Sequence, residues 1–422
     1  MEYLKQARKS RQASREAVAS RVAEMLERIR REGESAVRAF SRELDGWDPA
    51  QFRVSDEEIR AARQRLPQSV IEDIDFCQRQ VRRFAEAQRD SLRPFEIETE
   101  PGVVLGQTLI PIANVGAYIP GGRYPLVASA HMSILTAKVA GVDRVVACTP
   151  PARDGIYPAT LYAMAAAGAD EIYCLGGVQA LGAMVYGTSE IAPVDFLVGP
   201  GNAYVAEAKR QLFGEVGIDL LAGPTEIMVI ADESADPVIV AGDLLGQAEH
   251  GPDSPAVLIT RSRDLGNAVI AEASRQLETL PTAEVARAAW NDLGEVIYAE
   301  SDEEAVALAN DWAPEHLEVQ TRHLDWYQAR LKNYGSLFLG EHSTVAHGDK
   351  TIGTNHILPT GRAARYTGGL WVGKFLKTVT YQRVDRRGGE LIGPVCSRQC
   401  RLEGMEAHAV SVDLRLEKYA RR

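Results

Sequence analysis

From about residue 100, short apolar runs alternate along the chain with stretches of small residues at helical spacing. Strand-then-helix alternation of this kind is typical of βαβ units, which wind around a parallel sheet. A first series of such units runs from about residue 103 to 213, and a second runs from about 227 to 300. The sequence therefore predicts an α/β protein with two similar Rossmann-like parallel-sheet domains.

The two series do not cover the N-terminal or the C-terminal end of the chain. We therefore predict four parts, two α/β domains and one part at each end. Residues up to about 95 are charge-rich with helical spacing, and no low-complexity linker separates the halves. Near the C-terminus, 401–408 is predicted as a helix and 409–416 as a strand. The predicted parts are a helical N-terminal arm at 1–25, a discontinuous first α/β domain at 26–117 and 227–370 that carries the metal and catalytic motifs, a second α/β domain at 118–226 on the nucleotide side, and a small C-terminal tail domain at 371–422.

Charge and composition limit the classes of partner. The 422 residues carry a net charge of −11, whereas phosphate binding favours a cationic field, so no nucleic-acid partner is expected. No apolar run approaches the ~18 residues that span a bilayer, and the first residues lack the apolar core of a signal peptide. Five cysteines form no C-x-x-C pair, which favours reduced thiols in the cytoplasm. Cys396 and Cys400 are the only candidates for a thiolate metal site, which we do not favour.

The stretch GQAEHG at 246–251 brings two possible metal donors to the end of an apolar helical run. Gln247 and His250 are three residues apart, which on a helix places both side chains on one face. An imidazole and an amide oxygen in that arrangement could share a borderline metal such as zinc. The alternative is an ordinary helix C-terminus capped by Gly251.

The stretch APEHLE at 313–318 sets Glu315 beside His316 directly after a proline. Near a substrate, the histidine could relay protons while the carboxylate activates water. The alternative is a charged helix start, because Pro314 and Glu315 both suit the first turn of a helix.

Two further stretches carry histidines next to carboxylates. The polar, turn-like segment 348–360 holds Asp349 and His356, and loops positioned by a scaffold often carry binding residues. Glu403 and His408 lie five residues apart, which is not a same-face spacing on a helix. The alternatives are a surface turn for the first stretch and a solvated helix end for the second.

Glycine-rich turns follow three of the apolar runs, at 116–123, 175–182 and 198–209, although no G-x-G-x-x-G stands in a suitable context. The last of these turns opens a helix, whose first backbone N–H groups suit a pyrophosphate. These turns indicate a plausible nucleotide site and no more.

Taken together, these stretches resemble the histidinol dehydrogenase family, in the family's order and over nearly the whole chain. The matching pieces are YIPGG at 118–122, GPGNAYVAEAKRQ at 199–211, AGPTE at 222–226, QAEHGPDS at 247–254, PEHL at 314–317, GTNHILPT at 353–360 and EGMEAH at 403–408. The joint occurrence of these motifs outweighs the local alternative for each of them.

The resemblance implies a zinc- and NAD-dependent dehydrogenase that takes a small alcohol through an aldehyde to a carboxylate in two hydride transfers. It implies a homodimer with shared active sites and an exchanged tail domain. His316 would act as the base, and Glu315 would activate water for the second step. The implied zinc ligands are Gln247, His250, Asp349 and, from across the dimer interface, His408. The implied NAD contacts are Tyr118, Gln179 and Asn202, and the implied substrate contacts are Thr225, His316, His356 and Glu403.

Three departures from the family pattern concern the substrate. Thr225 replaces the usual serine of AGPSE, His131 stands where the biosynthetic enzymes carry an apolar, methionine-rich stretch, and Lys374 replaces an acidic residue. These features resemble the sulfopropanediol dehydrogenase branch, which oxidises 2,3-dihydroxypropane-1-sulfonate to sulfolactate. A sulfonate is anionic and is bound by cationic hydrogen-bond donors. The sequence therefore predicts cations near the pocket walls, namely His131, Arg362, Arg365 and Lys374, with ordinary surface charges as the alternative.

Other functions remain open from the sequence. The retained Glu403 keeps L-histidinol as an alternative substrate, and another polar alcohol is a further one. A protein that binds metal or nucleotide without catalysis is a different class, as is a zinc hydrolase that needs no NAD.

Overall fold

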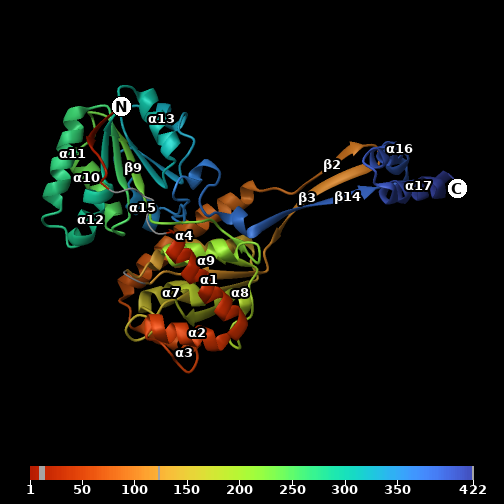
Figure 1. Ribbon diagram of the computed structural model, residues 1–422, viewed down its shortest axis with the longest axis horizontal. Coiled ribbons are helices and arrows are strands. Elements are labelled where there is room, and N and C mark those ends of the chain that lie inside the picture. The colour runs from red at the N-terminus through yellow and green to blue at the C-terminus, as the bar shows by residue number, and fades with distance from the viewer. Residues whose placement is uncertain (9–14, 122–123, 421–422) are drawn as a thin grey trace.

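A doubly wound five-stranded parallel sheet forms one half of the molecule, as drawn in the computed structural model, which describes residues 1–8, 15–121 and 124–420 (Figure 1). The strands are β4 (Asn114–Tyr118), β5 (Arg144–Thr149), β6 (Glu171–Cys174), β7 (Phe196–Val198) and β8 (Gly217–Ile218). Their order is β6-β5-β4-β7-β8, and every neighbouring pair is parallel. The strand order reverses between β4 and β7, and this is where α/β sheets bind ligands.

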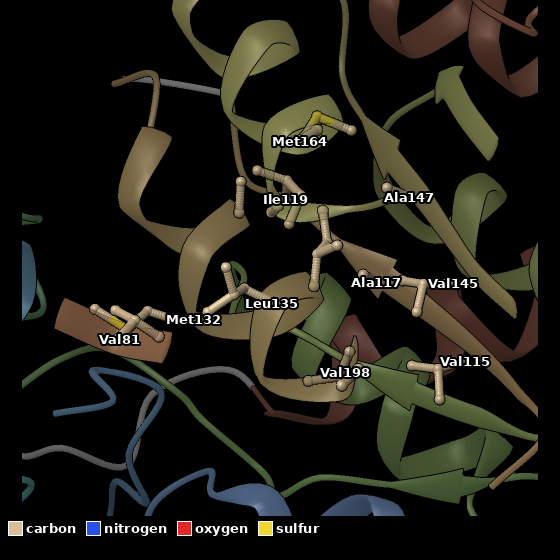
Figure 2. Close-up of a cluster of buried hydrophobic side chains, with 14 of the residues drawn as sticks. Val81, Val115, Ala117, Ile119, Met132, Leu135, Val145, Ala147, Met164 and Val198 are labelled. Atoms are coloured by element: carbon tan, nitrogen blue, oxygen red, sulfur yellow. The ribbon is translucent and has the colours of Figure 1, made fainter. Parts of the chain in front are cut away.

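Helices cover both faces of this sheet, so its strands are apolar on both sides. In β5, for example, Val145 and Ala147 face one core cluster while Val146 and Cys148 face the other. Figure 2 shows side chains of the first cluster around β4 and β5. The elements are α1 (Arg15–Glu32), α2 (Glu34–Phe40), the π-helical η1 (Ser41–Asp45), α3 (Asp56–Gln64), α4 (Gln68–Ser91), α5 (Val127–Ala130), the π-helical η2 (His131–Leu135), α6 (Thr136–Ala140), α7 (Pro158–Ala167), α8 (Gly177–Tyr186) and α9 (Ala203–Leu212).

The second half repeats the same strand order. Its strands are β1 (Glu2–Lys5), β9 (Ile227–Ala231), β10 (Ala256–Thr260), β11 (Glu295–Tyr298), β12 (His316–Gln320) and β13 (Ser336–Leu339). The order β11-β10-β9-β12-β13 is parallel throughout, and β1 adds to the β11 edge in antiparallel pairing. The helices are α10 (Pro237–Ala248), α11 (Arg263–Gln276), α12 (Ala283–Leu293), α13 (Asp302–Trp312), α14 (Leu324–Gln328) and α15 (Val345–Lys350). The chain then continues through the 3₁₀ turn η3 (Ala363–Arg365) to η4 (Val372–Phe375), which packs on α4 and α6 of the five-stranded half. The predicted α/β class with parallel sheets is confirmed.

A slender arm and a helical tail project from the two sheet halves (Figure 1). The arm is an antiparallel sheet of β2 (Phe95–Glu100), β3 (Val103–Pro111) and β14 (Leu376–Val384), with β3 in the middle. The tail is a pair of packed helices, α16 (Arg386–Leu402) and α17 (Glu406–Ala420). Arg401 and Ser397 on α16 both contact the Asp413 carboxylate on α17, at 2.7 and 2.6 Å. These contacts join the two helices into one unit.

The structure corrects three predictions about local structure and domain membership. Residues 2–5 form β1 rather than part of a helical arm, while residues 9–14 lie outside the described residues. Helices α1 to α4 pack on α6 to α9 of the five-stranded half, not on the half that carries 227–370. Residues 409–416 belong to helix α17 rather than a strand. A short run of alternating apolar residues fits both periods, and the packing of α17 on α16 decides between them.

Candidate active site

A cavity of about 620 Å³ lies between the two sheet halves. Side chains from each half meet across it, since Ser129 Oγ lies 3.1 Å from His356 Nε2 and Asn355 Nδ2 donates to the carbonyl of Met132 at 3.0 Å. The wall from the five-stranded half includes Asp45, Tyr118, Gly121, Tyr124, Ser129, Pro150, Gly177, Gly201 and Asn202. The wall from the six-stranded half includes Thr225, His250, Asp253, Glu315, His316, Asp349, Lys350 and His356.

The five-stranded half meets the cavity with the carboxyl ends of its strands. Tyr118 ends β4, and Gly177 and Asn202 open the helices that follow β6 and β7. The left-handed φ of 125° at Gly199 lets β7 approach β4 closely, because a Cβ there would lie 2.1 Å from the carbonyl oxygen of Tyr118. Glycine backbone and helix N-termini at a switch point are what a pyrophosphate group requires.

The three predicted NAD residues have different positions. Tyr118 lines the cavity, its hydroxyl accepts a 3.1 Å hydrogen bond from Gly177 N–H, and burial raises the pKa of Tyr118 to about 12. Asn202 also lines the cavity, and its Oδ1 caps helix α9 by accepting from the backbone of Tyr204 and Val205. Gln179 is fully buried outside the described cavity lining and donates to Asp45 Oδ2 at 2.8 Å. Gln179 can therefore act on a ligand only through Asp45.

The six-stranded half meets the cavity with the amino ends of its two central strands. Glu226 immediately precedes β9, and His316 is the first residue of β12. Helix α13 ends at Ala313, which has a left-handed φ of 53°, and Pro314 then leads the chain into the strand. Glu315 thus directly precedes a buried strand that His316 begins, and the alternative of a charged helix start is wrong.

A chain of hydrogen bonds leads from helix α10 to the Glu315 carboxylate. The Gln247 amide donates to the hydroxyl of Thr225, which in turn donates to Glu315 Oε2. The same oxygen accepts from the backbone N–H of Glu226 at 2.9 Å. Thr225 thereby supplies the hydroxyl that a serine would supply at this place. Two donors converge on one oxygen, so the carboxylate is held in a single orientation.

The His316 imidazole is buried with its two nitrogens in different surroundings. Nδ1 lies 3.0 Å from the Glu226 carbonyl oxygen and 3.4 Å from Glu315 Oε2, which favours a proton on Nδ1. Nε2 is buried without a hydrogen-bond partner among the described residues and lies 3.8 Å from Asp349 Oδ1. Burial alone would lower the pKa of His316, but Glu315 and then Asp349 outweigh it and raise the pKa to about 9.

Two of the four predicted zinc ligands, His250 and Asp349, line this wall, and a third, Gln247, is hydrogen-bonded to Thr225 in the wall. Gln247 lies in the last turn of α10, His250 follows it, and Asp349 lies at the end of α15. Burial lowers the pKa of His250, which favours the neutral imidazole that a metal needs. Burial alone would raise the pKa of Asp349, but nearby imidazoles, His356 first, hold it below its ordinary value.

No group of three or more His, Cys, Asp or Glu side chains that could hold a metal ion is present among residues 1–8, 15–121 and 124–420. Of the four predicted ligands, Gln247 is an amide and His408 lies in the first turns of α17, so one chain brings only two predicted ligands of these types, His250 and Asp349, to this wall. Glu403 is likewise at the end of α16 in the projecting tail (Figure 1). Neither Glu403 nor His408 lines the cavity of its own chain.

The remaining predicted substrate residues divide into one inside and several outside the cavity. His356 lines it, with Nδ1 3.0 Å from the Asp349 carbonyl, and burial lowers its pKa. His131 is buried against Gln78 at 3.2 Å, and burial lowers its pKa to about 3. Outside the described lining, Lys374 donates to Thr367, Arg362 pairs with Asp311, and Arg365 donates to the Arg362 carbonyl.

Several cavity residues were not predicted from the sequence. Asp45, Ser129 and Tyr124 come from the five-stranded half and lie in stretches without any local signal. Lys350 is different, because it directly follows Asp349 in the polar segment that sequence reasoning had singled out. The position of Lys350 next to the predicted zinc ligand Asp349 could have indicated that this lysine lines the cavity.

No helix in the described part of the chain combines the length and the apolar character needed to cross a membrane.

Comparison with known proteins identifies the family to which the chain belongs. Residues 8–416 match the family model described as histidinol dehydrogenase. The chain belongs to the histidinol dehydrogenase family. Members of this family are NAD-dependent oxidoreductases, and zinc binding is general among them.

Individual relatives show how close the match is. A "histidinol dehydrogenase homolog" of Shouchella clausii is 56% identical over 422 residues, covering 100% of both chains. The "sulfopropanediol 3-dehydrogenase" of Ruegeria pomeroyi is 46% identical over 422 residues, covering 99% of this chain and 97% of its own. The crystal structure of histidinol dehydrogenase from Elizabethkingia anophelis superposes with a TM-score of 0.92 at 36% identity, covering 98% of this chain and 95% of the other.

Proposed function

We propose that this protein is a zinc-dependent, NAD-linked dehydrogenase that oxidises 2,3-dihydroxypropane-1-sulfonate to 3-sulfolactate. One alcohol, two NAD⁺ and one water would give the carboxylate, two NADH and three protons. The observation that carries the proposal is a single cavity that joins a buried Glu315–His316 pair to a glycine-lined sheet edge. The Ruegeria relative named sulfopropanediol 3-dehydrogenase, 46% identical over 99% of this chain, supports the substrate.

His316 is placed to serve as the proton acceptor in both oxidation steps when its imidazole is neutral. Its pKa of about 9 keeps it charged near neutral pH, and the positive charge of a zinc ion held beside it would lower that pKa. His316 Nδ1 is held by the Glu226 carbonyl, so Nε2 is the nitrogen left to take a proton from the substrate hydroxyl. Glu315 would take a proton from the water that adds to the aldehyde, since Thr225 and the Glu226 N–H fix its carboxylate. His356, held between Ser129 and Asp349, would orient the substrate.

The residues at the amino edge of the six-stranded sheet fit zinc in kind. An amide oxygen, an imidazole and a carboxylate form a donor set suited to this ion, and Gln247, His250 and Asp349 would hold it. Bound there, zinc would polarise the alcohol oxygen. Removing the metal with a chelator should abolish oxidation while NAD binding persists, and added zinc should restore turnover. Turnover that survives complete metal removal would contradict this role.

We further propose that the enzyme is a homodimer in which the fourth ligand is the partner subunit's His408, with Glu403 of the partner subunit near the substrate. The arm and tail expose more apolar side chains than an isolated surface normally carries. These side chains are Phe95, Ile97, Ile110, Tyr381, Val384, Leu391, Val395, Leu402, Met405, Val410 and Leu414.

Subunit mixing tests this exchange. His316→Ala and His408→Ala homodimers should each be inactive. If tails are exchanged, a mixed dimer contains one site with both histidines intact and regains up to half of the activity per site. If each tail serves its own subunit, both sites of the mixed dimer lack one histidine, and no activity returns.

A substrate panel tests the reaction itself. NADH formation should be fastest with 2,3-dihydroxypropane-1-sulfonate and should reach two NADH per alcohol. Faster turnover of L-histidinol would favour the alternative that the retained Glu403 suggests. Activity without NAD would instead indicate hydrolysis.

A further inference from the structure

The end of helix α15 places a lysine in the wall of the active-site cavity. Lys350 directly follows Asp349, and its side chain is 50% exposed. Its Nζ lies 3.7 Å from Asp349 Oδ2, which is beyond hydrogen-bond reach. The ammonium is therefore near the site but not locked to a partner, and it can turn to a ligand.

Lys350 is the single lysine or arginine among the described residues that line the cavity. The acidic groups in the same described lining are Asp45, Asp253, Glu315 and Asp349. Among the Lys, Arg, Asp and Glu side chains of this lining, Lys350 is therefore the one whose charge attracts an anion. The four cations expected from the sequence, His131, Arg362, Arg365 and Lys374, are all absent from the described lining.

The position of Lys350 relative to the base suits a short bifunctional substrate. The two oxygens of the Asp349 carboxylate point in different directions, with Oδ1 3.8 Å from His316 Nε2 and Oδ2 3.7 Å from Lys350 Nζ. One carboxylate thus separates the proton acceptor from the ammonium. A substrate of a few carbons can contact both groups at once, with its hydroxyl at His316 and its other end at Lys350.

The charge of Lys350 also reaches the imidazoles of the site. After burial, which is the larger cause, Lys350 contributes to lowering the pKa of His250 and of His356. Both imidazoles line the same cavity as Lys350.

We propose that Lys350 is the specificity-determining residue that binds the anionic group of the substrate and selects a small anionic diol over a cationic amino alcohol. This inference rests on the proposed function for the reaction at the other end of the substrate. An ammonium binds a sulfonate, carboxylate or phosphate as a compact point charge through charge-assisted hydrogen bonds. The same charge disfavours an amino alcohol such as histidinol.

Steady-state kinetics of the zinc-loaded enzyme test the assignment with variants Lys350→Met and Lys350→Arg. The matched control is Lys332→Met, at an exposed lysine outside the described cavity lining. The substrates are 2,3-dihydroxypropane-1-sulfonate, glycerate and glycerol 3-phosphate, which share the primary alcohol end, and propane-1,2-diol, which lacks the anion. Losing one charged contact should raise KM for the preferred anionic substrate by about 10- to 100-fold in Lys350→Met. kcat should change little, the diol should be unaffected, and Lys350→Arg should recover most of the affinity.

Direct binding separates this inference from the proposed reaction. Calorimetric titration of the NAD-bound enzyme with propane-1-sulfonate, which cannot be oxidised, should show binding that weakens in Lys350→Met and not in Lys332→Met. If wild type fails to oxidise the sulfonated diol but this dependence holds, the substrate proposal falls and the anion-binding role stands. An unchanged KM and unchanged propane-1-sulfonate binding in Lys350→Met would overturn the inference. An equal loss for propane-1,2-diol would also overturn it.

Discussion

The two sheet halves have the same strand order but present opposite edges to the shared cavity. In the five-stranded half the carboxyl ends of β4 and β7 face the cavity, and helices α8 and α9 begin there. In the six-stranded half the amino ends of β9 and β12 face it, and helices α10 and α15 end there. The first edge offers backbone N–H groups, which suit phosphates, and the second offers side chains, which suit metal and proton chemistry. The edge, not the topology, sets the chemistry of each half.

The buried charges of the two halves differ in the same way. In the five-stranded half, Lys209 pairs with Asp219, and together they bind both backbone groups of Gly199. In the six-stranded half, two acids share one site, with Glu318 on β12 and Asp243 on α10. One pair fixes a backbone turn, and the other joins the elements that carry side-chain donors.

Replacing His316 is the most direct test of the difference between the two halves, and we expect it to have the largest effect. His316→Asn should lower kcat by about 10²- to 10⁴-fold, because general acid–base catalysis contributes on that scale. NAD affinity, measured by fluorescence titration, should change little, since the nucleotide edge belongs to the other half. Unchanged turnover would show that the chemistry lies elsewhere.

Lys209→Met tests the nucleotide half. Removing one partner of a buried ion pair leaves the Asp219 charge uncompensated, so the free energy of unfolding should fall by about 3–5 kcal/mol. Urea denaturation measures this loss, and KM for NAD should rise because the Gly199 turn loses its support. The neighbouring Arg210→Met, which removes an exposed pair with Glu207, should change stability by less than about 1 kcal/mol. Equal losses in the two variants would contradict the assignment.

Two helix caps provide a matched pair with a smaller effect. Asn202 caps α9 at the nucleotide edge, and Asp236 caps α10 away from the cavity. Replacing either with Ala should cost about 0.5–2 kcal/mol of stability. Only Asn202→Ala should also raise KM for NAD. If both variants, or neither, affected KM, Asn202 would have no role beyond capping.

The smallest expected effect concerns Glu318. Burial, and then the neighbouring Asp243, raise its pKa well above the ordinary value, so the folded state favours the protonated carboxyl. Glu318→Gln keeps the shape and the hydrogen-bonding groups and should cost under about 1 kcal/mol. A raised carboxyl pKa means that the folded state holds a proton that the unfolded state releases, so wild-type stability falls as pH rises above the ordinary pKa of glutamate.

Urea titrations at about pH 6 and about pH 9 check the sign. The Gln variant lacks this proton and should gain stability relative to wild type at the higher pH. A difference between the two proteins that is the same at both pH values would indicate that Glu318 does not hold its proton.

The class of fold could be predicted from the sequence because it depends on local pattern: apolar runs such as 144–149 are buried on both faces. The motifs that carry Glu315, His316 and Asp349 each had an ordinary structural alternative, and only their joint occurrence indicated a shared site. The predictions that were wrong concern features that depend on long-range packing. Nothing local indicates that 2–5 pairs with β11 or that helices α1 to α4 cover the other sheet. The cations expected near the substrate were chosen by sequence proximity, which does not reveal the direction of a side chain.

The pairing of β1 with β11 has a consequence for how the chain folds. Lys5, at the end of β1, donates from Nζ to the carbonyl oxygen of Trp290 at 2.7 Å, so nearly 290 residues must be in place before this edge can close. Closing so long a loop is entropically costly, and contacts of high sequence separation form slowly. Strand β1 thus waits until all strands of the five-stranded half and those up to β11 have been made. Once β11 has formed and before β1 pairs with it, the β11 edge stands open, and at that stage a nascent chain is most exposed to pairing with a neighbour.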